Sequence, residues 1–348
     1  MDRRLFLTSS ALTLGLIAAP AIVRAKSKRF EGITLRINGY GGDYDRILTE
    51  KVAIPLEKET GLKVAYTPST SGGAVARIIA SPDDPPYDLV MCDAPNMPDL
   101  INAGALLPTD LDRAVIDRML PGVREFGDYG IPMSLASMVI TQNKNLVKDP
   151  VTSYADLTRP DLKGHVGMFN LENSGGILQL LALADSNGGS VDNVDPAFAA
   201  LRKIKPNLVA TTGSTVNLLQ MFEREEARAG SFWDGRIFSM QKAGRPMSLV
   251  APKEGIYALR SYVSPVKGTK HPEAAKAYLE RILSPEYSLE MTSFFGYASL
   301  IDVTVPKEIA DKAINYGEGG LANLKAINWE KVALHRGDWL TRFNREMA

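Results

Sequence analysis

Short apolar segments alternate with helical patterns in the first third of this chain, and that alternation constrains its fold more than any other feature. The pattern predicts strands at 33–38, 63–67 and 89–92, with helices at 43–60 and 73–81 between them. A β-α-β-α-β order is typical of an α/β fold whose parallel or mixed sheet carries helices on both faces. In open sheets of this kind, ligands bind outside the carboxyl ends of the strands.

Polar loops follow the predicted strands at that edge. They span 39–44, 68–73 and 92–96, and each contains Gly, Ser, Thr, Asp or Tyr. Any single loop of this composition is compatible with an ordinary turn. Three consecutive loops with hydrogen-bonding groups at one edge indicate a binding site.

The later part of the chain predicts a second α/β region reached by an extended crossing at 129–143. A second extended segment, 256–263, returns the chain to the first region. We therefore expect one lobe from 28–133 and 256–301, a second lobe from 134–255, and a helical tail at 302–348 that packs back on the second lobe. The other elements expected after the first crossing are strands at 165–170, 230–233 and 247–250, and helices after Ser174 and at 195–205, 214–227, 271–282 and 285–294.

The N-terminal segment has the features of an export signal. Arg3 and Arg4 precede an apolar run at 11–19, and Val23-Arg24-Ala25 offers a small-x-small cleavage site. The apolar run is too short to anchor the chain in a bilayer. We predict that residues 1–25 are a twin-arginine signal peptide and that the mature protein is periplasmic.

Composition excludes several classes of function. The chain has 40 basic and 40 acidic residues, which leaves no electrostatic footprint for nucleic acid or an anionic membrane. Cys92 is the only cysteine, so no intramolecular disulfide can form, and we expect it to be a small buried side chain. His165, His271 and His335 lie far apart in sequence, without metal-site spacing. We expect no metal ion, no cofactor and a monomer.

A series of short motifs occurs in a characteristic order along the chain. They are Tyr87-Asp88-Leu89-Val90 with Asn102-Ala103-Gly104-Ala105-Leu106-Leu107-Pro108, Tyr129-Gly130-Ile131-Pro132, Ser153-Tyr154-Ala155-Asp156-Leu157 with Leu162-Lys163-Gly164, Ala243-Gly244-Arg245-Pro246, and Pro252-Lys253-Glu254-Gly255. In this order and spacing, the chain resembles the extracellular solute-binding proteins of ABC importers, in particular the group that contains the spermidine/putrescine receptors.

The resemblance implies a two-lobed periplasmic binding protein of the type II-like class, with a ligand cleft between the lobes. Such a receptor closes about its hinge around a small solute and delivers it to an ABC permease and its ATPase, without chemical reaction. Trp233-Asp234-Gly235 resembles the family's "WNG" motif, whose aromatic ring stacks on the ligand. The pocket positions that the resemblance implies are Tyr40, Asp93, Asn173, Ser174, Ser214, Trp233, Asp234 and Arg260.

Departures from the family pattern concern charge. Where polyamine receptors have Trp-Met-Asp-Ser, this chain has Ala258-Leu259-Arg260-Ser261. A guanidinium repels a cationic amine but offers a bidentate fork to a carboxylate or phosphonate. Asp234 either meets a ligand ammonium group or forms an internal ion pair with Arg260 or Arg236. We therefore expect an anionic or zwitterionic solute, such as an amino acid or a γ-aminobutyrate-like compound.

Other functions remain open at this point. A polyamine receptor would use Glu172, Asp93 and Asp234 as its acids. A ferric-ion receptor is disfavoured because the adjacent tyrosine pair is missing, since Tyr297 lies between Gly296 and Ala298. An exported enzyme on the same scaffold would need a nucleophile and a base, and the sequence offers no Cys-His or Ser-His arrangement.

Overall fold

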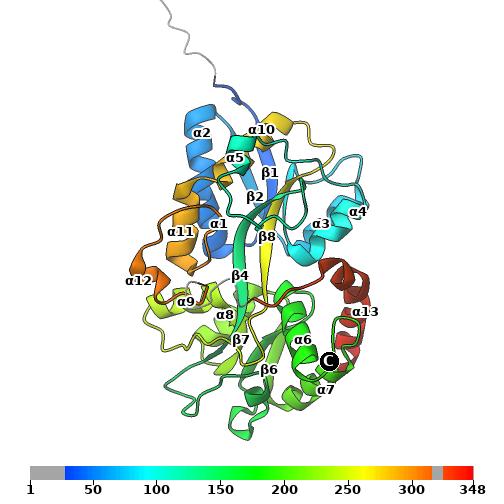
Figure 1. The fold of residues 1–348 in the computed structure, drawn as a ribbon, viewed down its shortest axis with the longest axis vertical. Helices are drawn as coiled ribbons and strands as arrows, with labels where there is room; N and C mark the ends of the chain where they lie inside the picture. Colours follow the sequence, from blue (N-terminus) through cyan, green and yellow to red (C-terminus); the bar gives the residue numbers. More distant parts are fainter. Residues whose placement is uncertain (1–27, 316–323, 348) are drawn as a thin grey trace, which may run out of the picture.

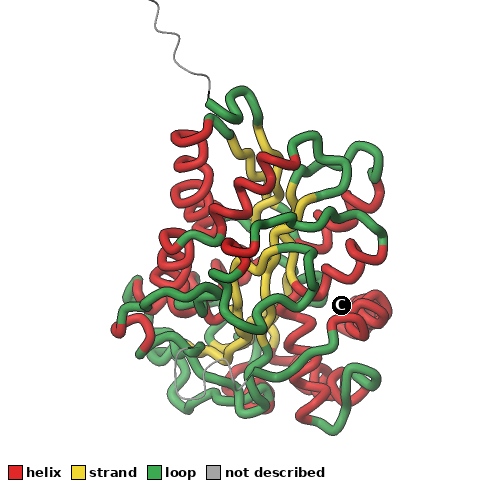
Figure 2. Tube along the Cα trace, turned by 45° about the horizontal axis from the view of Figure 1, so that its top comes forward, coloured by secondary structure: helices red, strands yellow, loops and turns green. Residues whose placement is uncertain are grey.

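The protein folds around one continuous sheet that runs through two halves of the molecule. A computed structural model describes residues 28–315 and 324–347, so the predicted signal peptide lies outside the described residues. Helices flank the sheet on both sides in each half (Figures 1 and 2). The strand order is β2-β1-β3-β8-β4-β7-β5-β6. The strands are β1 Thr34–Gly39, β2 Lys63–Pro68, β3 Leu89–Asp93, β4 Ile131–Gln142, β5 Val166–Phe169, β6 Leu208–Thr212, β7 Ala229–Trp233 and β8 Ala258–Pro265.

The sheet is mixed, as predicted for an α/β fold. β1 pairs in parallel with β2 and β3, and β5 pairs in parallel with β6 and β7. The two long strands in the middle, β4 and β8, run antiparallel to each other. β8 also pairs antiparallel with β3, and β4 with β7. This arrangement joins two parallel α/β units through a central antiparallel pair.

Helices of the upper half in Figure 1 cover β1, β2, β3 and β8. They are α1 Gly42–Leu48, α2 Ile54–Thr60, α3 Ser71–Ala80, α4 Met97–Asn102, α5 Arg113–Ile116, α10 Pro272–Ile282 and α11 Pro285–Phe295. The helix predicted at 43–60 is interrupted by a π-helical turn at Thr49–Ala53. Pro55 explains the interruption, because it has no N–H to continue the α-helical hydrogen-bond ladder. Gly61 then ends α2 in the left-handed conformation.

The lower half differs more from the sequence-based expectation. Its helices are α6 Ser174–Ser186, α7 Asp195–Ile204, α8 Thr215–Glu223 and α9 Asp234–Lys242. The strand β6 and the helix α9 were not predicted. The strand expected at 247–250 is wrong, because Val250 forms only an isolated bridge to Ile140 of β4, and Met247 only one to Asn143 just after β4. α9 begins directly after β7, without the loop that normally marks a change from strand to helix.

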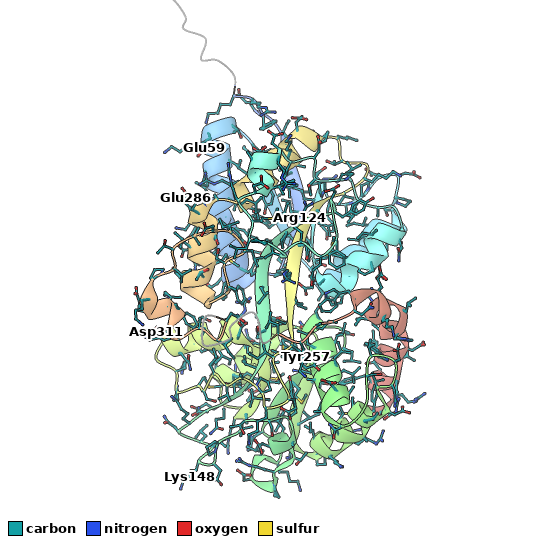
Figure 3. All side chains as sticks on the ribbon, viewed as in Figure 1. Glu59, Arg124, Lys148, Tyr257, Glu286 and Asp311 are labelled. Atoms are coloured by element: carbon teal, nitrogen blue, oxygen red, sulfur yellow. The ribbon has the colours of Figure 1, made fainter. Side chains whose placement is uncertain are left out.

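β4 is the principal crossing between the halves. All of its residues are buried. Its first part pairs with β8 as far as Ser137, and from Met138 onward it pairs with β7. Tyr257, just before β8, lies between the two halves (Figure 3). Its carbonyl oxygen accepts the N–H of Met138 at 2.9 Å, at the point where β4 changes its partner. We propose that 28–133 and 256–301 form one lobe and 134–255 the other, and this change of partner supports the boundary within β4.

The C-terminal helix α13, Trp329–Met347, contacts both halves. It packs on α7 in the lower half and on α4 in the upper half. Ion pairs support both contacts: Arg342 with Asp195 below, and Arg336 with Asp99 above. A short helix, α12 Lys307–Ala310, lies on the opposite side of the molecule (Figure 1). No helix among the described residues has the length and apolar character to cross a bilayer.

Candidate ligand-binding site

A cavity of about 550 Å³ lies between the two halves. The upper half contributes the starts of α1 and α3 and the end of β3. The lower half contributes the starts of α6, α8 and α9. The principal residues that line the whole cavity are Tyr40, Tyr44, Ser71, Asp93, Glu172, Asn173, Ser174, Ser214, Thr215, Val216, Trp233, Arg236, Leu259, Ser261 and Tyr297.

Asp93 places a carboxylate on the upper wall of the cavity. It is the last residue of β3, so its side chain emerges at the carboxyl edge of the sheet. Its Oδ1 accepts hydrogen bonds from the Tyr40 hydroxyl at 2.9 Å and the Ser261 hydroxyl at 2.7 Å. Burial and the neighbouring Asp93 raise the pKa of Tyr40, which therefore stays a neutral donor. Within residues 28–315 and 324–347, Asp93 has no cationic partner within 4 Å.

Arg236 places a guanidinium on the lower wall. The residue is 7% exposed and lies over the ring of Phe295, 4.9 Å from its centroid. No carboxylate of the described chain lies within 4 Å of it, and no described acceptor bonds its guanidinium. From the sequence, Arg236 was expected only as a possible partner of Asp234. Arg236 is the third residue of α9 and directly follows Trp233-Asp234-Gly235, and this closeness to the motif was a usable signal.

Aromatic rings form the apolar part of the wall. Trp233 is 8% exposed, lines the cavity and packs on Phe169 with ring centroids 5.9 Å apart. Tyr40 meets Tyr44 edge to face at 5.1 Å. Tyr297 stacks on Phe295 at 5.0 Å, the same ring that underlies Arg236. Such walls suit a small organic solute with an aliphatic stem.

Most of the predicted pocket residues meet at this cavity. Asn173 and Ser214 lie there as N-caps: Asn173 accepts the N–H of Gly175 at 2.9 Å, and Ser214 accepts that of Asn217 at 3.2 Å. The predicted residues that line the cavity are Tyr40, Asp93, Asn173, Ser174, Ser214 and Trp233. Two predicted residues lie elsewhere.

Asp234 is buried below the cavity wall, which corrects its predicted contact with ligand. It is 2% exposed, and its carboxylate accepts the N–H of Ser137 at 3.0 Å and the side-chain amide of Asn315 at 2.7 Å. It pairs with neither arginine suggested by the sequence. Burial raises its pKa to about 7.

Arg260 points away from the cavity, which corrects its predicted role at the anionic end of the ligand. Side chains alternate between the two faces of a strand, so Leu259 and Ser261 of β8 line the cavity while Arg260 lies on the other face. There it forms an ion pair with Glu125 at 2.8 Å and lines a separate cavity of about 180 Å³ beside Trp329. It is a structural partner of Glu125.

The thiol of Cys92, next to Asp93 in the chain, is poorly suited to chemical reaction. Cys92 is fully buried, and burial raises the pKa of its thiol, which disfavours the nucleophilic thiolate. Among the described side chains, no three His, Cys, Asp or Glu gather closely enough to hold a metal ion. The arrangement of Asp93, Arg236 and the aromatic rings is suited to binding.

Comparison with known proteins identifies the family. Residues 51–315 match the family described as bacterial extracellular solute-binding protein. The chain belongs to this family. It is 26% identical over 294 residues to the spermidine/putrescine-binding periplasmic protein of Escherichia coli strain K12, covering 81% of this chain and 80% of that relative.

Solved structures show the same fold. An ABC transporter protein from Clostridium perfringens is 23% identical, with a TM-score of 0.70 over 90% of this chain and 100% of that one. The Atu4243-GABA receptor is 22% identical, with a TM-score of 0.74 over 90% of this chain and 98% of that one. The protein is therefore a solute-binding protein with the two-lobed fold of periplasmic binding proteins. Solute-binding proteins of ABC importers work with a membrane permease and an ATPase. The predicted fold class and family are confirmed.

Proposed function

We propose that this receptor captures a small zwitterionic organic solute of the ω-amino acid type, similar to γ-aminobutyrate (GABA). One observation carries the proposal: Asp93 and Arg236 line the same cavity from opposite halves, and within the described chain neither is neutralised by an ion pair. Leaving two charges poorly solvated is costly unless a ligand supplies the complementary charges. A solute with an ammonium group at Asp93 and an anionic group at Arg236 supplies both.

Contacts on both walls also explain closure. A ligand shifts a two-state receptor toward its closed form only by binding that form more tightly. Asp93 belongs to a strand of the upper half, and Arg236 to a helix of the lower half. A solute that pairs with both therefore stabilises the closed arrangement.

Polyamine binding is the second candidate. The E. coli relative is named for spermidine and putrescine, and two carboxylates, Asp93 and Glu172, line the cavity. Against it stands Arg236, because a buried guanidinium on the cavity wall repels a second ammonium group. The shared fold does not decide between these ligands, since a GABA receptor also has it.

We further propose that the protein binds its solute without chemical change, acts as a monomer and has no nucleic-acid partner. The burial of Cys92 supports a non-enzymatic role. We propose export through the twin-arginine route, supported by Arg3 and Arg4 and the apolar run after them.

Paired arginine variants test the proposal. Isothermal titration calorimetry with GABA should show that Arg236→Gln loses affinity by about tenfold to a hundredfold, as expected for loss of a charged hydrogen-bonding group. Arg260→Gln is the matched control, because Arg260 lies on the other face of β8, and it should leave affinity unchanged. Thermal unfolding of both variants checks that they fold. Equal GABA affinity in Arg236→Gln and wild type would reject Arg236 as the anion-binding group.

A further inference from the structure

Of the five helices of the described chain that begin at the cavity, α3, α6 and α8 present N-terminal N–H groups to it. Ser71 opens α3 in the upper half, and Ser174 and Thr215 open α6 and α8 in the lower half. All three residues line the cavity. The helices contain 10, 13 and 9 residues respectively. Each N-terminus carries a partial positive charge of about half an elementary charge, together with backbone N–H groups that lack helical acceptors.

Capping leaves some of these N–H groups free at every one of the three termini. The caps Thr70, Asn173 and Ser214 each bond one amide, that of Gly73, Gly175 and Asn217 respectively. The amides without an acceptor in the described chain are those of Ser71, Gly72, Ser174, Thr215 and Val216. Of these five residues, all but Gly72 line the cavity.

The loop before the short helix α1 differs, because a carboxylate of the protein already bonds its amides. Asp45, in the first turn of α1, accepts the N–H of Tyr40 at 2.9 Å and also bonds the amide of Gly41. A carboxylate of the protein thus occupies these loop amides beside the cavity. At α3, α6 and α8, the described chain provides no carboxylate on the free amides.

Arg236 points independently to an anionic ligand at the same place. It is 7% exposed, lines the cavity and has no acceptor for its guanidinium in the described chain. Three helix N-termini and one guanidinium together supply about two and a half positive charges. A carboxylate brings one negative charge and two oxygens. A phosphate-type group brings about −1.5 to −2 charges and three oxygens at neutral pH.

We propose that the anionic end of the solute is a tetrahedral phosphorus oxyanion, so that the ligand is an aminoalkyl phosphonate or an amino-alcohol phosphate monoester. This inference rests on the proposed function, because the ammonium end still pairs with Asp93. Three oxygens directed away from one another accept from α3 on one wall and from α6, α8 and Arg236 on the other. The same group then connects the two lobes on closure.

Three ligands of equal spacer length test the inference. GABA, 3-aminopropylphosphonate and O-phosphoethanolamine each place three atoms between the amine nitrogen and the carbon or phosphorus of the anionic group. Calorimetry on the wild-type protein should give at least about tenfold tighter binding for one of the phosphorus compounds than for GABA. Which of the two binds more tightly identifies the source as phosphonate or phosphate ester.

A backbone variant separates the helix N-terminus from its side chain. Proline is favoured at the first helical position, and Asn173 before Ser174 already has the extended conformation that proline requires (φ −92°, ψ 138°). Ser174→Pro removes the free N–H, whereas Ser174→Ala keeps it. The phosphorus ligand should bind about threefold to tenfold more weakly to the proline variant than to the alanine variant.

The outcomes separate this inference from the proposed function. GABA binding as tightly as both phosphorus compounds, or no binding of either phosphorus compound, overturns the inference. In the first case, the receptor for a zwitterion stands. Putrescine binding more tightly than all three overturns the proposed function as well. A proline variant that does not fold leaves the wild-type ligand series decisive.

Discussion

The carboxylate of Asp234 accepts the backbone N–H of Ser137 at 3.0 Å, at the residue where β4 changes its pairing partner from β8 to β7. Asn315 donates its amide to the other carboxylate oxygen at 2.7 Å and accepts the Ser137 hydroxyl at 2.9 Å. This cluster joins the start of α9, the crossing strand and the C-terminal segment. A buried acid therefore lies where the two lobes are connected.

Asp234 should make stability depend on pH. Its pKa is raised from 3.8 to about 7 by burial, so the folded chain holds a proton that the unfolded chain has released between these values. The contribution of Asp234 to the free energy of unfolding is fully present below about pH 4 and is lost as the pH rises to about 7. In urea unfolding, the free energy of unfolding of wild type relative to Asp234→Asn should fall from pH 5 to pH 7 and then level off. A difference that is constant with pH would show that Asp234 does not titrate in this range.

Trp233 should report ligand binding by fluorescence, because its indole lines the cavity. Ligand should quench or shift the wild-type emission, and Trp233→Phe should abolish this change. Trp329 and Trp339 lie in α13, so Trp329→Phe serves as the control and should keep the ligand-induced change. A signal that persists in Trp233→Phe and disappears in Trp329→Phe would place the ligand away from this cavity.

Asp93 should be required for ligands that carry an amine. Asp93→Asn keeps a side-chain oxygen that can accept from Tyr40 and Ser261 but removes the charge. Affinity for amine-bearing solutes should fall by about tenfold to a hundredfold, since hydrogen bonds to charged groups contribute about 1.5–3 kcal/mol. Calorimetry measures this directly. Unchanged affinity in Asp93→Asn would indicate that the ammonium group of the ligand binds Glu172 and not Asp93.

Gly130 precedes the crossing strand and should tolerate no side chain. Its φ is +74°, and an added Cβ would lie 2.4 Å from the Ser264 hydroxyl. Gly130→Ala should lower the free energy of unfolding by about 1–3 kcal/mol. Gly104 is the matched control, because its φ is +60° but nothing lies within 4 Å of an added Cβ. Equal losses in the two variants would assign the effect to backbone strain alone.

The fold was predictable because it depends on periodicity over many residues, whereas the charged site depends on single residues. Most strands and helices of the first lobe follow from apolar patterns, but the short helices α4 and α5 and the π-turn next to Pro55 do not. Arg260 was misplaced because a shift of one position along a strand moves a side chain to the other face. Arg236 was overlooked because α9 starts without a loop after β7. The free amides at Ser71 and Ser174 are backbone groups, which residue types alone do not reveal.

Titration of the wild-type protein with GABA and putrescine tests the central claim most directly. The two ligands share a four-carbon chain with nitrogen at one end and differ in the group at the other end, a carboxylate in GABA and an ammonium in putrescine. Because Arg236 faces the second group, GABA should bind at least about tenfold more tightly than putrescine. Tight putrescine binding with no measurable GABA binding would contradict the zwitterion account and establish a polyamine receptor.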